Sequence, residues 1–214
     1  MEQPESSTGK SGGFDFGLKH FLTNDEGETI ESPQFFAQSR HQIARLNKDL
    51  SHKQDGSNNR KRAKYRLAKA HNDIKNKRRD WFYKLSHALC DDYGAMYFED
   101  LNLNGMKRLW GRKVSDLAFG EFMQVLQHVA SKRGVRVRKI DRWEPTSQVC
   151  SRCGQRKTLD LTERVFECNA CGLVLNRDHN AAVNILRVGA STHDLEAVRR
   201  DDEKQSASES RSLV

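Results

Sequence analysis

The sequence predicts an α/β layer fold with a mixed β-sheet. Strand-like segments open the chain, two stretches with helical periodicity follow, and a strand, a helix, a strand and a closing helix come after them. Strands and helices in such an order are typical of a sheet whose faces are covered by helices. The 214 residues suffice for one ordinary domain and a small accessory module.

The predicted sheet begins with three short strands. Phe14-Asp15-Phe16 alternates apolar and polar residues, and residues 19–23 form a second short strand-like segment. The turn-forming sequence Asn24-Asp25-Glu26-Gly27 then leads into residues 29–31. Turn residues between strand-like runs favour hairpins, so we expect a three-stranded antiparallel start.

Two helices are predicted between residues 34 and 92. Ser32-Pro33 is a start signal for the first, and residues 55–59 break the pattern between the two. Their apolar positions recur at helical spacing, so we expect the two helices to pack as an antiparallel hairpin. These positions are Phe36, Ile43, Leu46 and Leu50 in the first helix and Leu67, Ala70, Ile74, Trp81, Leu85 and Ala88 in the second.

The remaining predicted elements are shorter. Residues 95–98 are apolar with the length of a strand, and a loop rich in Gly, Lys and Arg follows them. Ser115 is the expected N-cap of a helix that reaches about Arg133, with Gly134 as its C-cap. The expected later elements are a strand at 135–140, a cysteine module at 146–175 and a closing helix that buries Ala181, Ala182, Ile185 and Leu186. The polar segments 1–11 and 190–214 are expected to be disordered.

The charge distribution favours a polyanionic partner. The chain has 37 Lys and Arg against 29 Asp and Glu, and its acidic end from Asp194 leaves residues 1–193 with a net charge of +10. Ten Lys or Arg and a single acid, Asp73, lie between Arg60 and Arg79. A solvated helix face is the ordinary explanation of a charge run, but cations that neutralise phosphates gain affinity by releasing counterions, so we expect nucleic-acid contact here.

The cysteines indicate a metal site in a reducing compartment. Four of the five form Cys150-Ser151-Arg152-Cys153 and Cys168-Asn169-Ala170-Cys171, and glycine follows each pair. Two such knuckles complete a tetrahedral Cys₄ site, and four thiolates leave no open position, so the expected Zn²⁺ is structural. Redox use of the pairs is the alternative. Cys90 has no partner at metal spacing and is expected to pack inside its helix.

The sequence shows no apolar run of transmembrane length and no charged-then-apolar leader after Met1. We therefore expect a soluble intracellular protein that binds neither a membrane nor a small-molecule substrate.

Three carboxylates lie at expected strand or helix ends. Asp15 is in the first strand, Glu99 ends the segment that begins at residue 95, and Asp178 opens the last helix. Each acid by itself is more often a surface or capping residue. A shared catalytic role requires all three to converge in the fold.

Three blocks of sequence around these acids resemble the RuvC motifs of the TnpB/OrfB family. The blocks are residues 13–19 (GFDFGLK), 98–103 (FEDLNL) and 176–185 (NRDHNAAVNI). Residues 143–154 resemble the family's zinc-ribbon entry, and residues 108–117 also match. Together the motifs cover about residues 12–189 in order. Members of the family are nucleases encoded by insertion sequences, guided by RNA and related to type V CRISPR effectors.

The resemblance implies an RNase H-like (RuvC) nuclease domain, formed by residues 12–145 and 174–189, with the helical hairpin at 34–92 as an insertion. It also implies that Asp15, Glu99 and Asp178 are the catalytic residues. Carboxylate oxygens suit Mg²⁺, and two ions about 4 Å apart can activate water and stabilise a leaving oxygen. Asp15 would bridge the ions. Asp100 neighbours Glu99, but adjacent strand residues face opposite sides, so only one of them can be a ligand.

The resemblance further implies DNA and a guide RNA as partners, in the cytoplasm of a prokaryote and in association with its nucleoid. Cations around Trp110 suit phosphates together with base stacking, although Trp110 could instead anchor the next helix in the core. The expected contact residues are Arg60, Lys61, Arg62, Lys64, Lys75 and Arg78 in the helix and Lys107, Arg108, Trp110, Arg112 and Lys113 in the loop.

One departure from the family pattern affects the expected activity. Family members carry a long N-terminal half before the first motif, whereas here that motif begins within fifteen residues of Met1. The chain would then be a truncated product, a fragment or one part of a divided protein. We expect a metal-dependent DNA endonuclease core. The alternatives are a truncated module that binds nucleic acid without cutting it, and a zinc-ribbon transcription factor, which would leave the three acid motifs unexplained.

Overall fold

The computed structural model describes residues 9–160 and 163–192. The chain divides into two compact units. The first is drawn from the segments Met1–Glu31, Asp92–Asn102 and Gly134–Val214, and the second from Ser32–Asp91 and Leu103–Arg133. The expected disorder of residues 1–8 and 193–214 lies outside the described residues.

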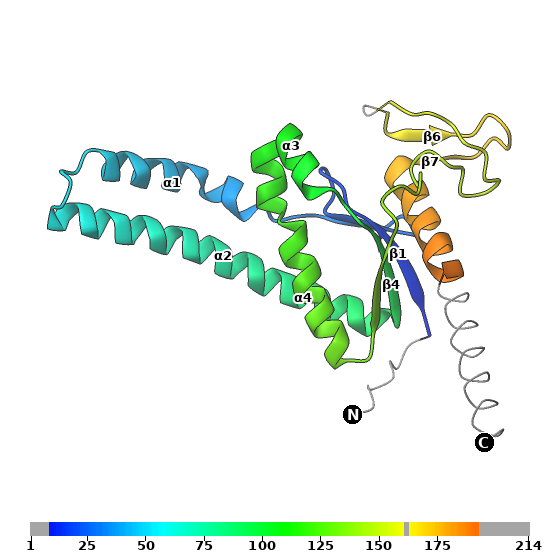
Figure 1. Ribbon diagram of the computed structural model, residues 1–214, viewed down its shortest axis with the longest axis horizontal. Helices are drawn as coiled ribbons and strands as arrows, with labels where there is room; N and C mark the ends of the chain where they lie inside the picture. The colour runs from blue at the N-terminus through cyan, green and yellow to red at the C-terminus, as the bar shows by residue number, and fades with distance from the viewer. Residues whose placement is uncertain (1–8, 161–162, 193–214) are drawn as a thin grey trace, which may run out of the picture. The chain divides into compact units, whose positions relative to one another are not determined.

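The first unit is built on a five-stranded mixed sheet. Its strands are β1 (Ser11–Asp15), β2 (Leu22–Asn24), β3 (Thr29–Ile30), β4 (Ala95–Glu99) and β5 (Arg136–Ile140), in the spatial order β3-β2-β1-β4-β5. The first three strands pair in antiparallel fashion, as expected, whereas β1 pairs with β4 and β4 with β5 in parallel (Figure 1). The mixed sheet predicted from the order of elements is confirmed, with its first strand beginning at Ser11 inside the segment expected to be disordered.

The two faces of the sheet carry different contacts because successive strand residues point to opposite sides. On one face Phe14 stacks on Phe98 with ring centroids 5.1 Å apart. On the other face Gly13 lies beside its register partner Tyr97. The helix formed by residues 177–192 packs on this second face, where Ile185 is fully buried.

Two glycines set the distance between this helix and the sheet. A Cβ atom built on Gly13 would lie 2.2 Å from the carbonyl oxygen of Ala182, and one built on Gly189 would lie 2.2 Å from Tyr97 Cδ1. Only glycine permits such an approach. The closing helix therefore sits directly against β1 and β4, and it extends to residue 192, beyond the expected end near residue 189.

The second unit is helical. It contains α1 (Phe35–Ser51), α2 (Asn58–Asp92), α3 (Leu103–Leu117) and α4 (Phe119–Lys132). The predicted hairpin of α1 and α2 is confirmed, with Ile43, Ala70 and Ile74 in its core. None of the helices in the described part of the chain has the length and apolar character that crossing a membrane requires.

The predicted buried stripe of α2 is wrong in its second half. Phe82, Ser86 and Leu89 are buried there in place of Trp81, Leu85 and Ala88. In a straight helix, positions seven residues apart rotate slowly around the axis, so a heptad pattern does not stay on the buried face through 35 residues. The N-terminal half of α2 packs on α1, whereas Phe82 contacts Phe122 of α4 at 5.5 Å.

The loop predicted after residue 102 is also wrong, because residues 103–117 are helical with a kink at Trp110 and Gly111. Ser115 lies inside this helix and donates its hydroxyl to the Gly111 carbonyl, so it is no N-cap. Helix α4 starts instead after Ala118, and its C-cap is Arg133; Gly134, predicted to be the C-cap, follows one residue later with φ of 69°.

A two-stranded ribbon completes the first unit. Strand β6 (Val165–Glu167) pairs with β7 (Val174–Asn176), and Phe166 is fully buried beside Cys150 and Cys168. Strand β7 runs without a linker into the helix at Arg177. The cysteine module predicted at 146–175 thus groups with the sheet, not apart from it.

Candidate metal sites and nucleic-acid surface

The four cysteines converge on a single point. The ligand atoms of Cys150, Cys153, Cys168 and Cys171 all lie within 4.8 Å of one another. The Sγ atoms of Cys150 and Cys171 are 3.6 Å apart, and those of Cys153 and Cys168 are 3.5 Å apart. Four sulfurs about 2.3 Å from a tetrahedral Zn²⁺ would be about 3.8 Å apart, so these residues fit that ion.

Both halves of the cluster are built in the same way. The amide of Gly154 donates to the Cys150 carbonyl, and the amide of Gly172 donates to the Cys168 carbonyl, each at 2.9 Å. The two glycines have φ of 77° and 70°, a conformation that side chains disfavour. The hydrogen bond from the Cys171 amide lowers the pKa of the Cys168 thiol to about 6, whereas burial raises the pKa of the Cys171 thiol to about 12, so without a cation the cluster retains protons that a metal ion would displace.

The three predicted acids lie at one end of the sheet. Asp15 is the last residue of β1 and Glu99 the last of β4, one position beyond the paired residues Phe14 and Phe98. Strand alternation places Asp15 and Glu99 on the face of Gly13 and Tyr97, which the helix of residues 177–192 covers.

The direction of that helix brings the third acid to the same end. Ala182 contacts Gly13, and one turn earlier Asp178 Oδ2 lies 3.6 Å from the Cβ position of Gly17. The helix therefore runs antiparallel to β1, with its first turn near the end of that strand. Asn176 caps the helix by accepting hydrogen bonds from the amides of Asp178 (2.8 Å) and His179 (3.4 Å).

Electrostatic coupling among the acids supports their proximity. Burial raises the pKa of Asp15 well above its ordinary value, and the carboxylates of Asp178 and Glu99 raise it further. Burial also raises the pKa of Glu99, with a contribution from Asp100. Within the described residues only the four cysteines form a cluster tight enough for one ion, and the three carboxylates do not.

Asp100 is engaged elsewhere. Its carboxylate accepts hydrogen bonds from Arg142 and, at 3.0 Å, from Lys139, and these two cations lower its pKa. Glu99 has no such cationic partner among the hydrogen bonds and ion pairs of the described chain. This geometry favours Glu99 over Asp100 as the site residue, and that choice stays a prediction.

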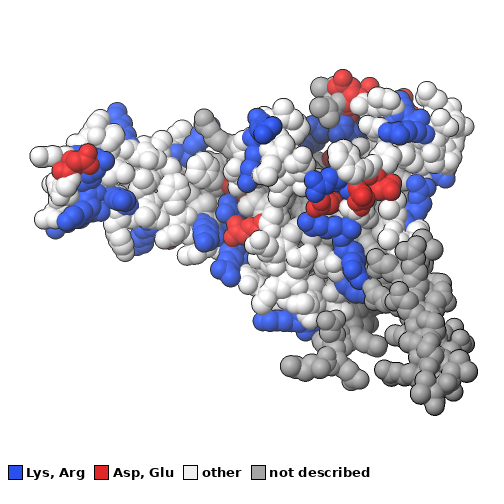
Figure 2. Space-filling model, viewed as in Figure 1, with Lys and Arg blue, Asp and Glu red and all other residues white. Residues whose placement is uncertain are grey.

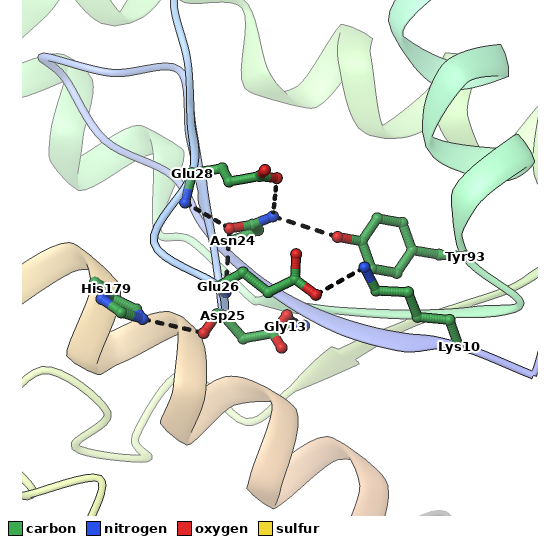
Figure 3. A network of polar contacts seen from close by, with 8 residues as sticks. All are labelled: Lys10, Gly13, Asn24, Asp25, Glu26, Glu28, Tyr93 and His179. Carbon is green, nitrogen blue, oxygen red and sulfur yellow. Dashed lines mark hydrogen bonds and ion pairs between the residues drawn. The ribbon is translucent and has the colours of Figure 1, made fainter.

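A polar network ties the β2–β3 turn to the first turn of the closing helix (Figure 3). Asp25 accepts a hydrogen bond from the Gly13 amide through its carboxylate (2.9 Å), and its carbonyl oxygen lies 3.0 Å from His179 Nε2. The neighbouring Glu26 pairs with Lys10 at 2.8 Å. These contacts hold β1 and His179, the neighbour of Asp178, against the β2–β3 turn. No sequence pattern predicted them.

Two buried asparagines connect the closing helix to the cysteine module. Asn180 accepts from the Ser151 amide at 2.9 Å and donates to the Val149 carbonyl at 2.8 Å. Asn184 donates to the carbonyls of Thr146 (2.8 Å) and Val149 (2.7 Å). Sequence reasoning missed this role, although two asparagines four residues apart beside buried alanines were a detectable signal.

The structure separates the predicted nucleic-acid contacts into two groups. Arg60 pairs with Asp55 of the α1–α2 loop at 2.7 Å, and Arg78 of α2 pairs with Glu121 of α4 at 2.9 Å, so both cations are already engaged within the protein. The other predicted cations with described side chains are exposed, and Figure 2 shows Lys and Arg along the hairpin. These are Lys61, Arg62, Lys64, Lys75, Lys107, Arg108 and Lys113.

Trp110 is 39% exposed, which contradicts the alternative that it is a core anchor. The Arg112 side chain lies outside the described part of the structure.

Two family models and several curated proteins match this chain. Residues 1–109 match the OrfB_IS605 family model, described as "Probable transposase", and residues 119–185 match a "Cas12f1-like, TNB domain" model. A "Putative RNA-guided DNA endonuclease" of Streptomyces pristinaespiralis is 35% identical over 87% of this chain and 47% of its own length. "TnpB-like protein L79" of Acanthamoeba polyphaga mimivirus is 33% identical over 83% of this chain and 37% of its own length.

The fold also has a counterpart among solved structures. The protein in a cryo-EM structure titled as a Cas12f1-sgRNA-target DNA complex matches with a TM-score of 0.60 and 20% identity, over 87% of this chain and 51% of that one. The chain spans about half the length, or less, of the relatives it matches. Because one family model covers half of its residues, the chain belongs to the OrfB family of probable transposases, whose relatives include TnpB-like proteins.

Proposed function

We propose that this chain is the catalytic part of a metal-dependent DNA endonuclease with an RNase H-like (RuvC) fold. The names of its relatives support a nuclease, and the mixed sheet with acids at the ends of β1 and β4 supports the fold. Because the chain covers only about half of those relatives, phosphodiester cleavage, the DNA substrate and the guide RNA are all part of the proposal.

The observation that carries the proposal is the convergence of Asp15, Glu99 and Asp178 at one end of the sheet. The charges of Glu99 and Asp178 and burial together raise the pKa of Asp15, so the fold holds repelling carboxylates near one another at a cost in stability. Such an arrangement is typical of a functional site. Its residues fit Mg²⁺, a hard cation that prefers carboxylate oxygens.

Two Mg²⁺ ions about 4 Å apart, held by carboxylates, are a common arrangement in enzymes that cleave phosphodiesters. When bound, the ions would lower the pKa of a water molecule and stabilise the charge on the leaving oxygen. Asp15, whose pKa both other acids raise, would hold the ions together with Glu99 and Asp178.

The protein's own contribution is to position these acids. Asn176 and the buried contact at Gly13 set where Asp178 stands, and Asp25 holds both β1 and His179. The cysteine cluster would bind Zn²⁺ as a structural ion, because four thiolates fill its coordination sphere. The exposed cations, with Trp110, would contact DNA and a guide RNA.

Cleavage of labelled single-stranded DNA by the purified chain tests the proposal. We expect cutting that requires Mg²⁺ and that Glu99→Ala abolishes, while Glu167→Ala, which removes an exposed carboxylate from the same unit, leaves cutting intact. Binding measured in parallel should survive in Glu99→Ala. Cutting by Glu99→Ala at the normal rate would refute the assignment. No cutting by the unaltered chain, with binding retained, would favour the non-cleaving module.

A further inference from the structure

Trp143 is the most exposed large hydrophobic side chain in the described part of the protein, with 84% of its surface accessible. An indole offers a large apolar area, and removing that area from water would be favourable. At this exposure the side chain adds little to packing on the sheet or around the cysteine cluster. A single exposed apolar side chain is common on protein surfaces, so what Trp143 can bind depends on the groups that surround it.

The segment that carries Trp143 is held at both ends. Asp141 accepts a hydrogen bond from the Trp143 amide through its side chain (2.9 Å) and from the Glu144 amide through its carbonyl (3.2 Å). A few residues later, Asn184 of the closing helix donates to the carbonyl of the buried Thr146. The indole is thus presented by a fixed turn, and binding would cost little ordering of the backbone.

Trp143 lies at the same end of the sheet as the three acids. It follows the end of β5 at Ile140, and Ile140 is the register partner of Glu99. A shallow depression at this end of the sheet is lined by Asp100, Lys139, Ile140, Asp141, Arg142 and Trp143. Asp100, the neighbour of Glu99, holds both cations beside the indole by accepting their hydrogen bonds.

We propose that Trp143 is a stacking platform for an unpaired base of the DNA strand that enters the acid site, with Lys139 and Arg142 placed to contact the adjoining phosphates. A tryptophan face stacks on any base that is free of its partner, and cations beside it suit the backbone. Each cation retains donors after pairing with one carboxylate, since ammonium offers three and guanidinium five. The inference rests on the proposed nuclease function for the identity of the strand.

Binding of a short fluorescein-labelled oligothymidylate to the full chain tests the platform by fluorescence anisotropy. All proteins carry Asp15→Asn, so that nothing is cut. We expect Trp143→Ala to weaken binding roughly 5- to 150-fold, the range that loss of one base stack produces. Trp143→Tyr should retain most of the affinity, because tyrosine also stacks.

Two further probes separate stacking from charge. An abasic strand of the same length has the same phosphates and no bases, so Trp143→Ala should bind it as the parent does. A blunt duplex, whose bases are paired, should be equally insensitive. Because Trp143 is exposed, its removal leaves no cavity, and melting curves should match those of the parent.

Equal affinity of the parent and Trp143→Ala for oligothymidylate would overturn the proposal, and so would an equal loss for the thymidylate and abasic strands. The outcome is independent of catalysis. If the chain stacks bases on Trp143 but never cuts DNA, the nuclease proposal is refuted and the stacking proposal stands. If the chain cuts DNA with Mg²⁺ but Trp143→Ala binds oligothymidylate as the parent does, the stacking proposal is refuted and the nuclease proposal stands.

Discussion

Replacing Gly13 by alanine should destabilise the protein although alanine suits a strand better than glycine. The φ angle of Gly13 is not in the left-handed region, so a Gly→Ala change that met no obstacle would stabilise by about 0.4–1 kcal/mol. The added Cβ would instead lie 2.2 Å from the Ala182 carbonyl oxygen and 2.5 Å from the Leu186 amide nitrogen. Both are backbone atoms of the closing helix, and neither can rotate away.

The size of the effect follows from these distances. Ordinary contact begins at 3.4 Å, so the helix would have to retreat by about 1.2 Å or the strand would have to bend. Overpacking of this kind costs roughly 1–3 kcal/mol, and a rigid backbone obstacle justifies the upper end. At about 2–4 °C per kcal/mol for a chain of this size, the melting temperature should fall by roughly 6–12 °C.

Thermal unfolding followed by circular dichroism measures the change. Gly9→Ala is the matched control, because its Cβ would meet nothing within 4 Å. Retreat of the helix also moves Asp178 away from Asp15, so Gly13→Ala should need more Mg²⁺ for half-maximal cleavage. A melting temperature for Gly13→Ala equal to that of Gly9→Ala would refute the close packing of helix and strand.

Three further predictions follow from the site. Asp15→Asn should raise the melting temperature of the metal-free protein by about 2–4 °C at neutral pH, because it removes a repelled carboxylate. The pKa of Asp15 is raised in the fold, so its charge destabilises the folded state at neutral pH. Below the ordinary pKa of 3.8 the carboxyl is protonated in the folded and the unfolded state, so the unaltered protein recovers that stability and the gain from Asp15→Asn should vanish. A gain that persists in acid would contradict the assignment. Cys168→Ser should abolish bound zinc, and unchanged zinc by elemental analysis would refute the four-thiolate site. Asn184→Ala should cost roughly 1–3 kcal/mol in chemical denaturation by leaving the Thr146 carbonyl without its donor, with Ser191→Ala, an exposed change in the same helix, as the control.

The predictable part of the fold depended on local signals. Short strand patterns with the turn at residues 24–27, and the two helical periodicities, identified β1 to β3 and the hairpin because each signal lies within one element. The helix at 103–117 was missed because its glycines and cations are typical of loops. Its tertiary contacts outweigh that composition: Asp116 accepts hydrogen bonds from the amides of Phe36 and Ala37 and so caps α1.

The candidate sites likewise combine features that a local pattern predicts with features that depend on tertiary contacts. The Cys-x-x-Cys spacing predicts a closed knuckle because both thiols belong to one turn. The acids could be proposed from their positions, but their convergence depends on the register of β1 with β4 and on the antiparallel course of the closing helix, which no local pattern reveals. For the same reason, nothing in the sequence distinguished Arg60 and Arg78, which are paired, from the exposed cations beside them.

Binding of Mn²⁺ in place of Mg²⁺ tests the central claim most directly, because it needs neither a guide nor a DNA substrate. Isothermal titration of the zinc-loaded chain should detect Mn²⁺ binding that Asp15→Asn, Glu99→Gln and Asp178→Asn each weaken at least about tenfold, the loss that follows from about 1.4 kcal/mol. Glu167→Gln should bind as the unaltered chain does. If the three variants bind Mn²⁺ as tightly as the unaltered chain, the acids do not form one metal site.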